Sequence, residues 1–300
     1  MRSEKAKNLS IVGAGRVGTA FALGLSRKGY KILSVVSKSS KSAKRLASNV
    51  RCSLHSNDLR RIHPETNLLL IAIPDSAIVE VAAIVSQLSH VDPKHLTVFH
   101  TSGMKTSDEL NALQARGASV FSLHPMQSFP HSTTVSELKG VSFGFEGLKN
   151  IRTRAQKIVD DLGGELVHIP KEAKILYHCA CVIASNYPVV LLNAVDELAR
   201  RVLKPNSLRH FRKLTESSVR NAFESPPRRA LTGPIARGDV AAVKDHLRAL
   251  LKRDKDLVGL YRVLGLNAAR MMVANGVAPS PELGALQKLL STEFEHLSFE

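Results

Sequence analysis

A glycine-spaced turn near the N-terminus, Gly13-Ala14-Gly15-Arg16-Val17-Gly18, constrains the fold of this chain most strongly. It follows an apolar run and opens into a helical pattern, which is the strand, turn and helix order of a phosphate-binding site. The first glycine permits a tight turn, the second lets the backbone approach a pyrophosphate, and the third lets the helix pack close to the strand. Glycine-rich turns are common, but this context predicts that a phosphate-bearing ligand binds here.

Short apolar segments alternate with helical patterns up to about residue 170, which predicts an α/β domain built on a doubly wound parallel sheet. The run Leu68–Ile73 is continuously apolar, as expected of a parallel strand that is buried on both faces. From Lys171 onward the strand patterns stop, so we expect domains at 1–170 and 171–300, the second all-helical. We expect strands at 9–12, 31–36, 51–54, 67–73, 96–99, 118–123, 141–145 and 165–169, and C-terminal helices at 171–203, 207–224, 240–253, 255–275 and 281–292.

The composition indicates an ordinary soluble protein, because 44% of the 300 residues are hydrophobic and 23% are charged. No apolar run approaches the roughly 18 residues of a membrane-spanning helix, and a first strand at Leu9 leaves no room for a cleavable signal. We therefore expect a cytoplasmic protein without a membrane partner. The three cysteines suggest packing and not a disulfide framework or a metal site. The net charge of +16 favours anionic ligands without choosing among them.

The residues after the second strand predict the cofactor. A carboxylate about 20 residues beyond the glycine turn holds the ribose of NAD, whereas a basic residue there accommodates the 2′-phosphate of NADP. No Asp or Glu occurs between Lys5 and Asn57, and Lys38 follows the strand, so we expect NADP; a solvated basic helix start is the alternative. The expected cofactor-binding residues are Gly13, Ala14, Gly15, Arg16, Val17, Gly18, Ser37, Lys38, Ser39, Ile73, Pro74 and Asp75.

Polar residues follow three neighbouring strands at the sheet edge where open α/β sheets bind ligands. Asp75 follows the fourth strand, where we interpret it as a helix N-cap beside the cofactor and not as a catalytic acid. Ser102 lies in a loop after His100, and His124 follows the sixth strand. A single histidine at a strand end is often structural, so a substrate contact stays an open alternative for both histidines.

The first helix of the C-terminal domain carries a polar stripe among apolar residues. Lysine can protonate a developing alkoxide or orient a carboxylate if burial lowers its pKa, although a solvated Lys-His face would give the same pattern. Pro188 disrupts the helix and could turn Asn186 inward. The stripe consists of Lys174, His178, Cys181 and Ser185.

A second candidate lies in the turn Gly233-Pro234-Ile235-Ala236-Arg237-Gly238-Asp239. The guanidinium of Arg237 suits a substrate carboxylate or a cofactor phosphate, and Asp239 can cap the next helix. A plain helix-linking turn with a solvated arginine is equally compatible with this spacing.

These motifs together resemble the Rossmann-like proteins that carry a DUF2520 helical domain, relatives of the 6-phosphogluconate dehydrogenase-like and ketopantoate reductase enzymes. The resemblance implies a helical domain like the C-terminal domain of 6-phosphogluconate dehydrogenase, a homodimer and NADP-dependent oxidoreductase activity. Hydroxyacid dehydrogenases carry a lysine in the corresponding helix and an asparagine four residues later. Lys174 matches the lysine, but this chain has His178 at the position of the asparagine. The segment His124-Pro125-Met126 is similar to the histidine motif of prephenate dehydrogenases. The resemblance rests on the glycine turn, His100–Gly103, Leu123–Phe129, Tyr177-His178, Ala184–Tyr187 and Gly233–Asp239.

The function that these expectations favour is hydride transfer between NADP and a small anionic carbonyl or hydroxy acid in a cleft between the domains. Lys174 or His124 would donate the proton, Ser102 and Asn186 would hydrogen-bond the reacting oxygen, and Arg237 would hold a carboxylate. His178 is a further candidate catalytic residue. An imine reductase of the pyrroline-carboxylate type is an alternative. A non-catalytic NADP sensor or nucleic-acid-binding protein is another, but the basic residues are scattered and aromatics are only 5%, so we expect no nucleic-acid partner.

Overall fold

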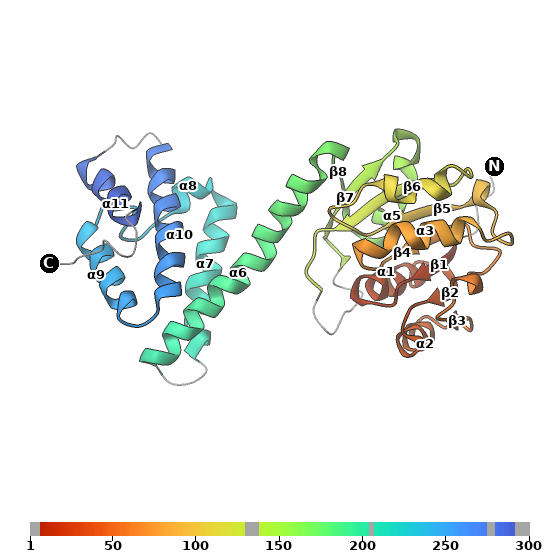
Figure 1. Ribbon diagram of the computed structural model, residues 1–300, viewed down its shortest axis with the longest axis horizontal. Helices are drawn as coiled ribbons and strands as arrows, with labels where there is room; N and C mark the ends of the chain where they lie inside the picture. Colours follow the sequence, from red (N-terminus) through yellow and green to blue (C-terminus); the bar gives the residue numbers. More distant parts are fainter. Residues whose placement is uncertain (1–6, 130–137, 204–206, 275–279, 292–300) are drawn as a thin grey trace. The chain divides into compact units, whose positions relative to one another are not determined.

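The computed structural model of the protein describes residues 7–129, 138–203, 207–274 and 280–291 (Figure 1). Its backbone contacts separate two compact units, Met1–Tyr187 and Pro188–Glu300. The strands end at His168, close to the predicted boundary, and the segment 171–187 that follows belongs to the first unit by its contacts. The two units are described one at a time.

The first unit contains an eight-stranded sheet in the order β3-β2-β1-β4-β5-β6-β7-β8. The pairs from β3 to β6 are parallel, β7 is antiparallel to β6, and β8 is parallel to β7. This arrangement confirms the predicted doubly wound sheet. The strands are β1 (Asn8–Val12), β2 (Lys31–Val36), β3 (His55–Ser56), β4 (Leu68–Ile71), β5 (Thr97–His100), β6 (Ser119–Pro125), β7 (Ser142–Gly147) and β8 (Glu165–His168).

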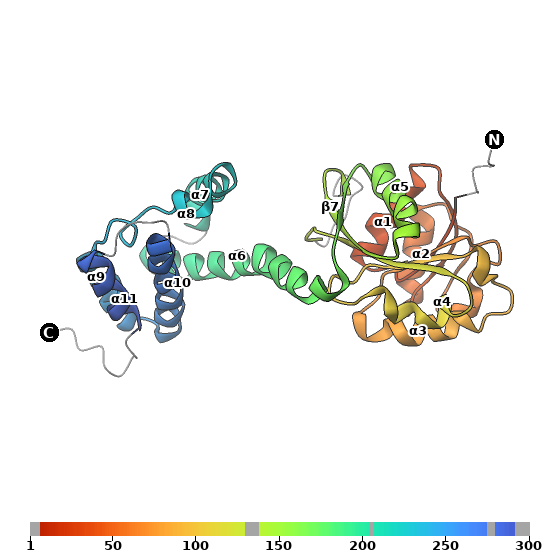
Figure 2. The ribbon, with the colours of Figure 1, turned by 90° about the horizontal axis from the view of Figure 1, so that it is seen from above.

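Helices cover both faces of this sheet (Figure 2). On one face lie α1 (Arg16–Ser26), α2 (Ser40–Asn49) and α5 (Arg152–Leu162), and on the other lie α3 (Ile78–Ser86) and α4 (Asn111–Gln114). Phe21 of α1 packs against Phe99 of β5 with ring centroids 5.8 Å apart, and Phe99 stacks on Phe121 of β6 at 5.2 Å. Burying such aromatic rings stabilises the contact between helix and sheet. The sheet is therefore covered on both faces. In sheets of this kind ligands bind at the carboxyl ends of the parallel strands.

Local signals in the sequence explain several helix ends, but two predictions, one of a strand and one of an N-cap, are corrected by the structure. Ser39 caps α2 through a bond from the Ser42 N–H, and Gly163 ends α5 with φ 75°. The strand predicted at 51–54 is wrong, because these residues form a turn with Arg51 at φ 54° and the two-residue β3 follows. Asp75 is not the predicted N-cap either: it is the first residue of the 3-10 turn Asp75–Ala77, and its carboxylate bonds elsewhere.

The second unit is helical throughout the part that the structure describes, as predicted. Within it α9, α10 and α11 share a core, and Asp239 and Ser280 cap α9 and α11 through bonds from Ala242 and Leu283 N–H groups. The short α8 was not predicted, and the predicted stop at Asn275-Gly276 lies outside the described residues. The helices are α6 (Lys174–Val202), which begins in the first unit, α7 (Arg212–Glu224), α8 (Pro227–Ala230), α9 (Val240–Leu251), α10 (Lys255–Ala274) and α11 (Pro281–Ser291).

The helix α6 also corrects one expectation about membranes. The segment Lys171–Val202 has 32 residues and a mean hydropathy of 1.7 over its most apolar window, so by length and composition it could span a membrane. The sequence suggested no such segment, because scattered polar residues interrupt every continuous apolar run. None of that window is buried, and exposed apolar side chains such as Leu176 and Ile183 are the source of its high hydropathy.

Candidate functional site

The three glycines of the first turn have different surroundings. Gly13 has φ 105°, and a Cβ there would lie 2.1 Å from the Ala72 carbonyl oxygen. A Cβ on Gly18 would lie 2.0 Å from the Gly13 carbonyl oxygen. A Cβ on Gly15 would meet no atom within 4 Å, although Gly15 has an extended backbone at φ −75° that any residue can adopt. The fold therefore requires Gly13 and Gly18, whereas the space beside Gly15, at the N-terminus of α1, is open.

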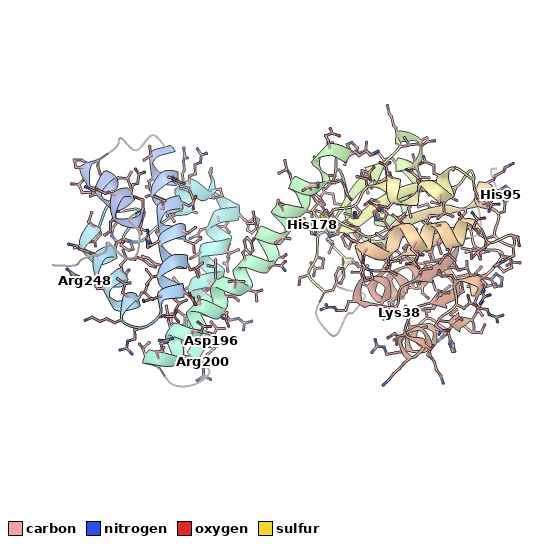
Figure 3. The ribbon with its side chains drawn as sticks, viewed as in Figure 1. Lys38, His95, His178, Asp196, Arg200 and Arg248 are labelled. Carbon is pink, nitrogen blue, oxygen red and sulfur yellow. The ribbon has the colours of Figure 1, made fainter. Side chains whose placement is uncertain are left out.

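The residues after β2 lie at the carboxyl end of that strand. They are next to the glycine turn that follows β1, because β1 and β2 are paired. Ser37 donates its N–H to the Ser56 carbonyl, and the Ser39 hydroxyl caps α2. Lys38, which is labelled in Figure 3, lies between them and is exposed. In the glycine turn Arg16 donates to the Phe129 carbonyl at 2.9 Å. Lys38 is thus an exposed cation close to the end of β2, and Lys41 in the first turn of α2 is exposed as well.

A cavity of about 220 Å³ lies at the carboxyl ends of β4, β5 and β6. Val17, in the first turn of α1, and Ile73 and Asp75 after β4 line it, which connects it to the expected cofactor turn. Residues from two further strand ends and from α6 complete its wall. They are Thr101, Ser102, Gly103, His124, Pro125, Gln127, Phe129 and His178.

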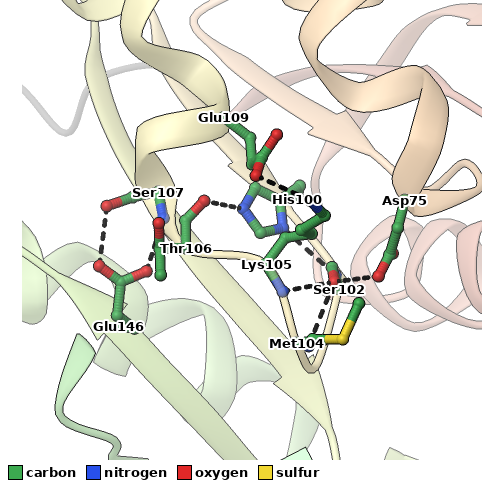
Figure 4. Close-up of polar contacts among 9 residues, drawn as sticks. All are labelled: Asp75, His100, Ser102, Met104, Lys105, Thr106, Ser107, Glu109 and Glu146. Atoms are coloured by element: carbon green, nitrogen blue, oxygen red, sulfur yellow. Dashed lines mark hydrogen bonds and ion pairs between the residues drawn. The ribbon is translucent and has the colours of Figure 1, made fainter. Parts of the chain in front are cut away.

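The loop after β5 is fixed by its own hydrogen bonds (Figure 4). His100 is fully buried, donates from Nε2 to the Thr106 carbonyl and accepts the Ser102 N–H at Nδ1. Burial lowers its pKa to about 4. Glu146 of β7 holds the other end of the loop by accepting from the N–H and the hydroxyl of Ser107 at 2.6 and 2.9 Å. His100 therefore has a structural role in this loop and does not line the cavity.

The hydroxyl of Ser102 is committed within the same loop. It donates to the Asp75 carboxylate at 2.7 Å and accepts the N–H groups of Met104 and Lys105 at 3.2 and 2.9 Å. Its proton is therefore not available to a second acceptor without a change of partner. The half-buried Asp75, in contrast, keeps a second carboxylate oxygen beside the cavity.

Lys174 is almost completely buried, with 1% of its surface exposed. Its ammonium donates to the Ser102 carbonyl at 3.1 Å and to the Ser122 hydroxyl at 2.6 Å, and Ser122 also donates to the Ser102 carbonyl. Burial lowers its pKa to about 8, although the nearby Glu146 and Asp75 carboxylates act in the opposite direction. Lys174 thus stabilises the loop after β5 through the Ser102 carbonyl, and it is not part of the cavity wall.

His124 and His178 are the two histidines that do line the cavity. Their ring centroids are 6.0 Å apart at an angle of 73°. Burial lowers the pKa of His124 to about 4, and the charges of Lys174 and His178 contribute in the same direction. His124 Nδ1 lies 2.6 Å from the hydroxyl of Tyr177. At neutral pH His124 is therefore an uncharged imidazole with one nitrogen already engaged.

Two predicted residues are not part of this cavity. Asn186 is exposed and accepts from the Ser185 hydroxyl at 2.8 Å, and α6 continues as one helix through Pro188. Arg237 is exposed in the second unit, in the turn that the sequence predicted. The sequence did not point to Tyr177 or Gln127 as site residues; Tyr177 could have been found, because it lies about one helical turn after Lys174.

Two family models match consecutive parts of the chain. A family model described as a Rossmann-like domain matches residues 2–125, and one described as a domain of unknown function, DUF2520, matches residues 141–268. Among curated proteins the sequence has no match.

Solved structures share the fold over most of the chain. A candidate NADP oxidoreductase from Bacteroides fragilis is 24% identical, with a TM-score of 0.73 over 87% of this chain and 97% of its own. A protein from Thermotoga maritima is 25% identical, with a TM-score of 0.68 over 89% and 99%. A pyrroline-5-carboxylate reductase from Coxiella burnetii is 16% identical, with a TM-score of 0.56 over 96% and 100%. The chain thus matches both a Rossmann-like model and a DUF2520 model, in agreement with the resemblance that its motifs predicted.

Proposed function

We propose that this chain is an NADP-dependent oxidoreductase that transfers hydride between the nicotinamide and a small anionic carbonyl or hydroxy acid. The observation that carries this proposal is the continuity of one cavity. Val17 of the glycine turn and the imidazoles of His124 and His178 line the same space of about 220 Å³. A dinucleotide held at the turn would have its reactive end beside polar groups that can bind a substrate oxygen.

The residues of the turn fit a dinucleotide. The space beside Gly15 is open, because an added Cβ would meet no protein atom within 4 Å, and this supports a ligand at that position. The N–H groups at the start of α1 would bind the pyrophosphate, and Lys38 with Ser37 and Ser39 would bind the 2′-phosphate. When bound, NADPH would supply the hydride, or NADP⁺ would accept it, which the amino acids of the chain cannot do.

The roles of the wall residues follow from their contacts. We propose that His124 hydrogen-bonds the reacting oxygen and that His178 assists it, because both line the cavity. Lys174 would act through the loop: its bond to the Ser102 carbonyl orients this wall, and its positive charge favours negative charge that develops nearby. Asn186 and Arg237 remain candidate substrate ligands.

The helix α6 supports the proposal of a homodimer. Apolar side chains on it are exposed in the single chain, among them Leu176 at 76% and Val189 at 66%. Exposed apolar patches of this kind mark protein interaction sites. A second copy that covered α6 would leave the protein soluble in the cytoplasm.

The test of this function is oxidation of NADPH, followed at 340 nm, against 2-keto acids, semialdehydes and cyclic imines. We expect turnover on a carbonyl substrate that depends on the protein concentration and on NADPH. Turnover confined to cyclic imines would instead identify an imine reductase, the activity that the Coxiella burnetii protein's name describes. Failure of the protein to bind either NADPH or NADH would contradict the proposal as a whole.

A further inference from the structure

The contact between His124 and Tyr177 joins separate elements of the first unit. His124 lies on β6, Tyr177 lies in the first turns of α6, and their rings meet edge to face with centroids 5.6 Å apart at 85°. The Tyr177 hydroxyl lies 2.6 Å from His124 Nδ1. This short bond fixes which side of the imidazole remains for a ligand.

Two glycines provide the room for this contact. Gly144 pairs with His124 in the β6–β7 register, and a Cβ there would lie 2.6 Å from the Tyr177 hydroxyl oxygen. A Cβ on Gly103 would lie 3.0 Å from both Cε1 and Nε2 of His124. Gly103 lines the cavity with His124, so the Nε2 side of the ring is next to the cavity wall while the Nδ1 side is turned to Tyr177. Side chains at either glycine would displace one of the two rings.

The direction of the hydrogen bond follows from the protonation of the two groups. Burial lowers the pKa of His124 and raises the pKa of Tyr177 well above its usual value, so both groups are uncharged at neutral pH. Cys181, four residues on, also lies close enough to raise the pKa of the Tyr177 hydroxyl. Imidazole nitrogen is a stronger acceptor than sulfur, which favours donation from the phenol O–H to Nδ1 over donation to Cys181. The single proton of the neutral imidazole then resides on Nε2.

We propose that Tyr177 is a positioning residue that holds His124 in the Nε2–H tautomer, so that the imidazole presents a hydrogen-bond donor to the substrate. The inference rests on the proposed function only for the identity of the acceptor, which would be a carbonyl oxygen. A neutral N–H donor polarises a carbonyl oxygen as charge develops on it. It offers no acceptor to a protonated imine, so the arrangement favours carbonyl over iminium substrates.

The tautomer can be measured without cofactor or turnover, by ¹⁵N NMR of the full chain labelled at histidine. We expect His124, assigned by the signals missing from His124→Asn, to carry its proton on Nε2 and none on Nδ1. His100 is an internal reference for this tautomer, because its Nε2 donates to the Thr106 carbonyl and its Nδ1 accepts the Ser102 N–H. A proton on Nδ1 of His124 in the unaltered chain would overturn the proposal.

Three variants test the part played by Tyr177. Tyr177→Phe removes the hydroxyl, and Gly144→Ala keeps it but moves it away from His124; both should give His124 signals averaged between the two tautomers. Cys181→Ala removes the competing partner and should leave the His124 signals unchanged. Unchanged signals in both Tyr177→Phe and Gly144→Ala would refute the role of Tyr177, and if Tyr177→Phe does not fold, Gly144→Ala and the unaltered chain decide.

Activity provides a separate readout. On a carbonyl substrate we expect Tyr177→Phe to lower kcat by about tenfold, the effect of one oriented hydrogen bond, with the KM for NADPH unchanged. A rise in that KM with kcat unchanged would instead indicate a general structural role. A protein without any turnover would contradict the proposed function and leave the NMR result to decide the tautomer.

Discussion

Replacing Gly15 and Gly18 by serine separates the needs of a ligand from the needs of the fold. Gly15 precedes α1 as its N-cap with φ −75° and ψ −172°, and no atom lies within 4 Å of an added Cβ. Serine is a preferred N-cap residue, so Gly15→Ser should change the free energy of unfolding by less than about 0.5 kcal/mol. An added Cβ on Gly18 would lie 2.0 Å from the Gly13 carbonyl oxygen, well inside van der Waals contact.

The clash at Gly18 sets the size of the expected difference. Overpacking of this kind costs about 3 kcal/mol or more, which lowers the melting temperature of a domain this size by about 6–12 °C. For Gly15→Ser we expect an unchanged melting temperature but a rise of about 30-fold in the Kd for NADPH. The added side chain would clash with the pyrophosphate of the bound cofactor, at a cost of about 2 kcal/mol of binding free energy.

Differential scanning fluorimetry and a fluorescence titration with NADPH measure the two effects. Since the two variants carry the same new side chain three residues apart, each is the control of the other. Wild-type affinity for NADPH in Gly15→Ser would refute the assignment of this turn to the cofactor.

Three further predictions concern the cofactor, the response to acid and the assembly. Lys38→Asp should weaken NADPH binding by tenfold or more while NADH binding changes little, because it places a carboxylate where a 2′-phosphate is expected; titrations that favour NADH over NADPH in the unaltered chain would contradict this. His100 and His124 have pKa values of about 4 in the folded chain against the ordinary histidine value of 6.5, so the unfolded chain binds more protons between these values. The free energy of unfolding should therefore fall as the pH drops from 6.5 to 4, by up to about 3 kcal/mol for each histidine, and equal urea midpoints at pH 7 and pH 4.5 would exclude it. Leu176→Asp and Ile183→Asp, at side chains 76% and 58% exposed, should convert a dimer to a monomer in light scattering, whereas a monomeric unaltered chain would disprove the assembly.

Most of the fold could be predicted because its signals are local. Apolar runs located the long strands, and residues such as Ser39, Gly163 and Asp239 act on their own helix ends. The strand β3 was misplaced because a two-residue edge strand has no periodicity to detect. The high mean hydropathy of α6 was not predicted for a related reason. Its polar residues are dispersed among apolar ones, so no long continuous apolar run marks the helix.

The site was predicted less well because its contacts join distant segments. The sequence drew attention to Ser102, His124 and Lys174, but not to how they are bonded. Ser102 bonds Asp75 across 27 residues, His124 bonds Tyr177 across 53, and Lys174 bonds the Ser102 carbonyl across 72. No pattern along the chain reports whether a hydroxyl is free or already engaged. The burial of Lys174, which turns a candidate acid into a support for the loop, likewise arises only from packing.

The burial of Lys174 has a consequence for how such proteins can be recombined. The ammonium that supports the Ser102 loop, and the histidine of the cavity wall that follows one turn later, both come from a helix that continues into the second unit. A cut at residue 170 would leave a complete sheet whose ligand cavity lacks part of its wall. The two parts are therefore not interchangeable modules, and a functional exchange between relatives would have to carry the first turns of α6 together with the sheet.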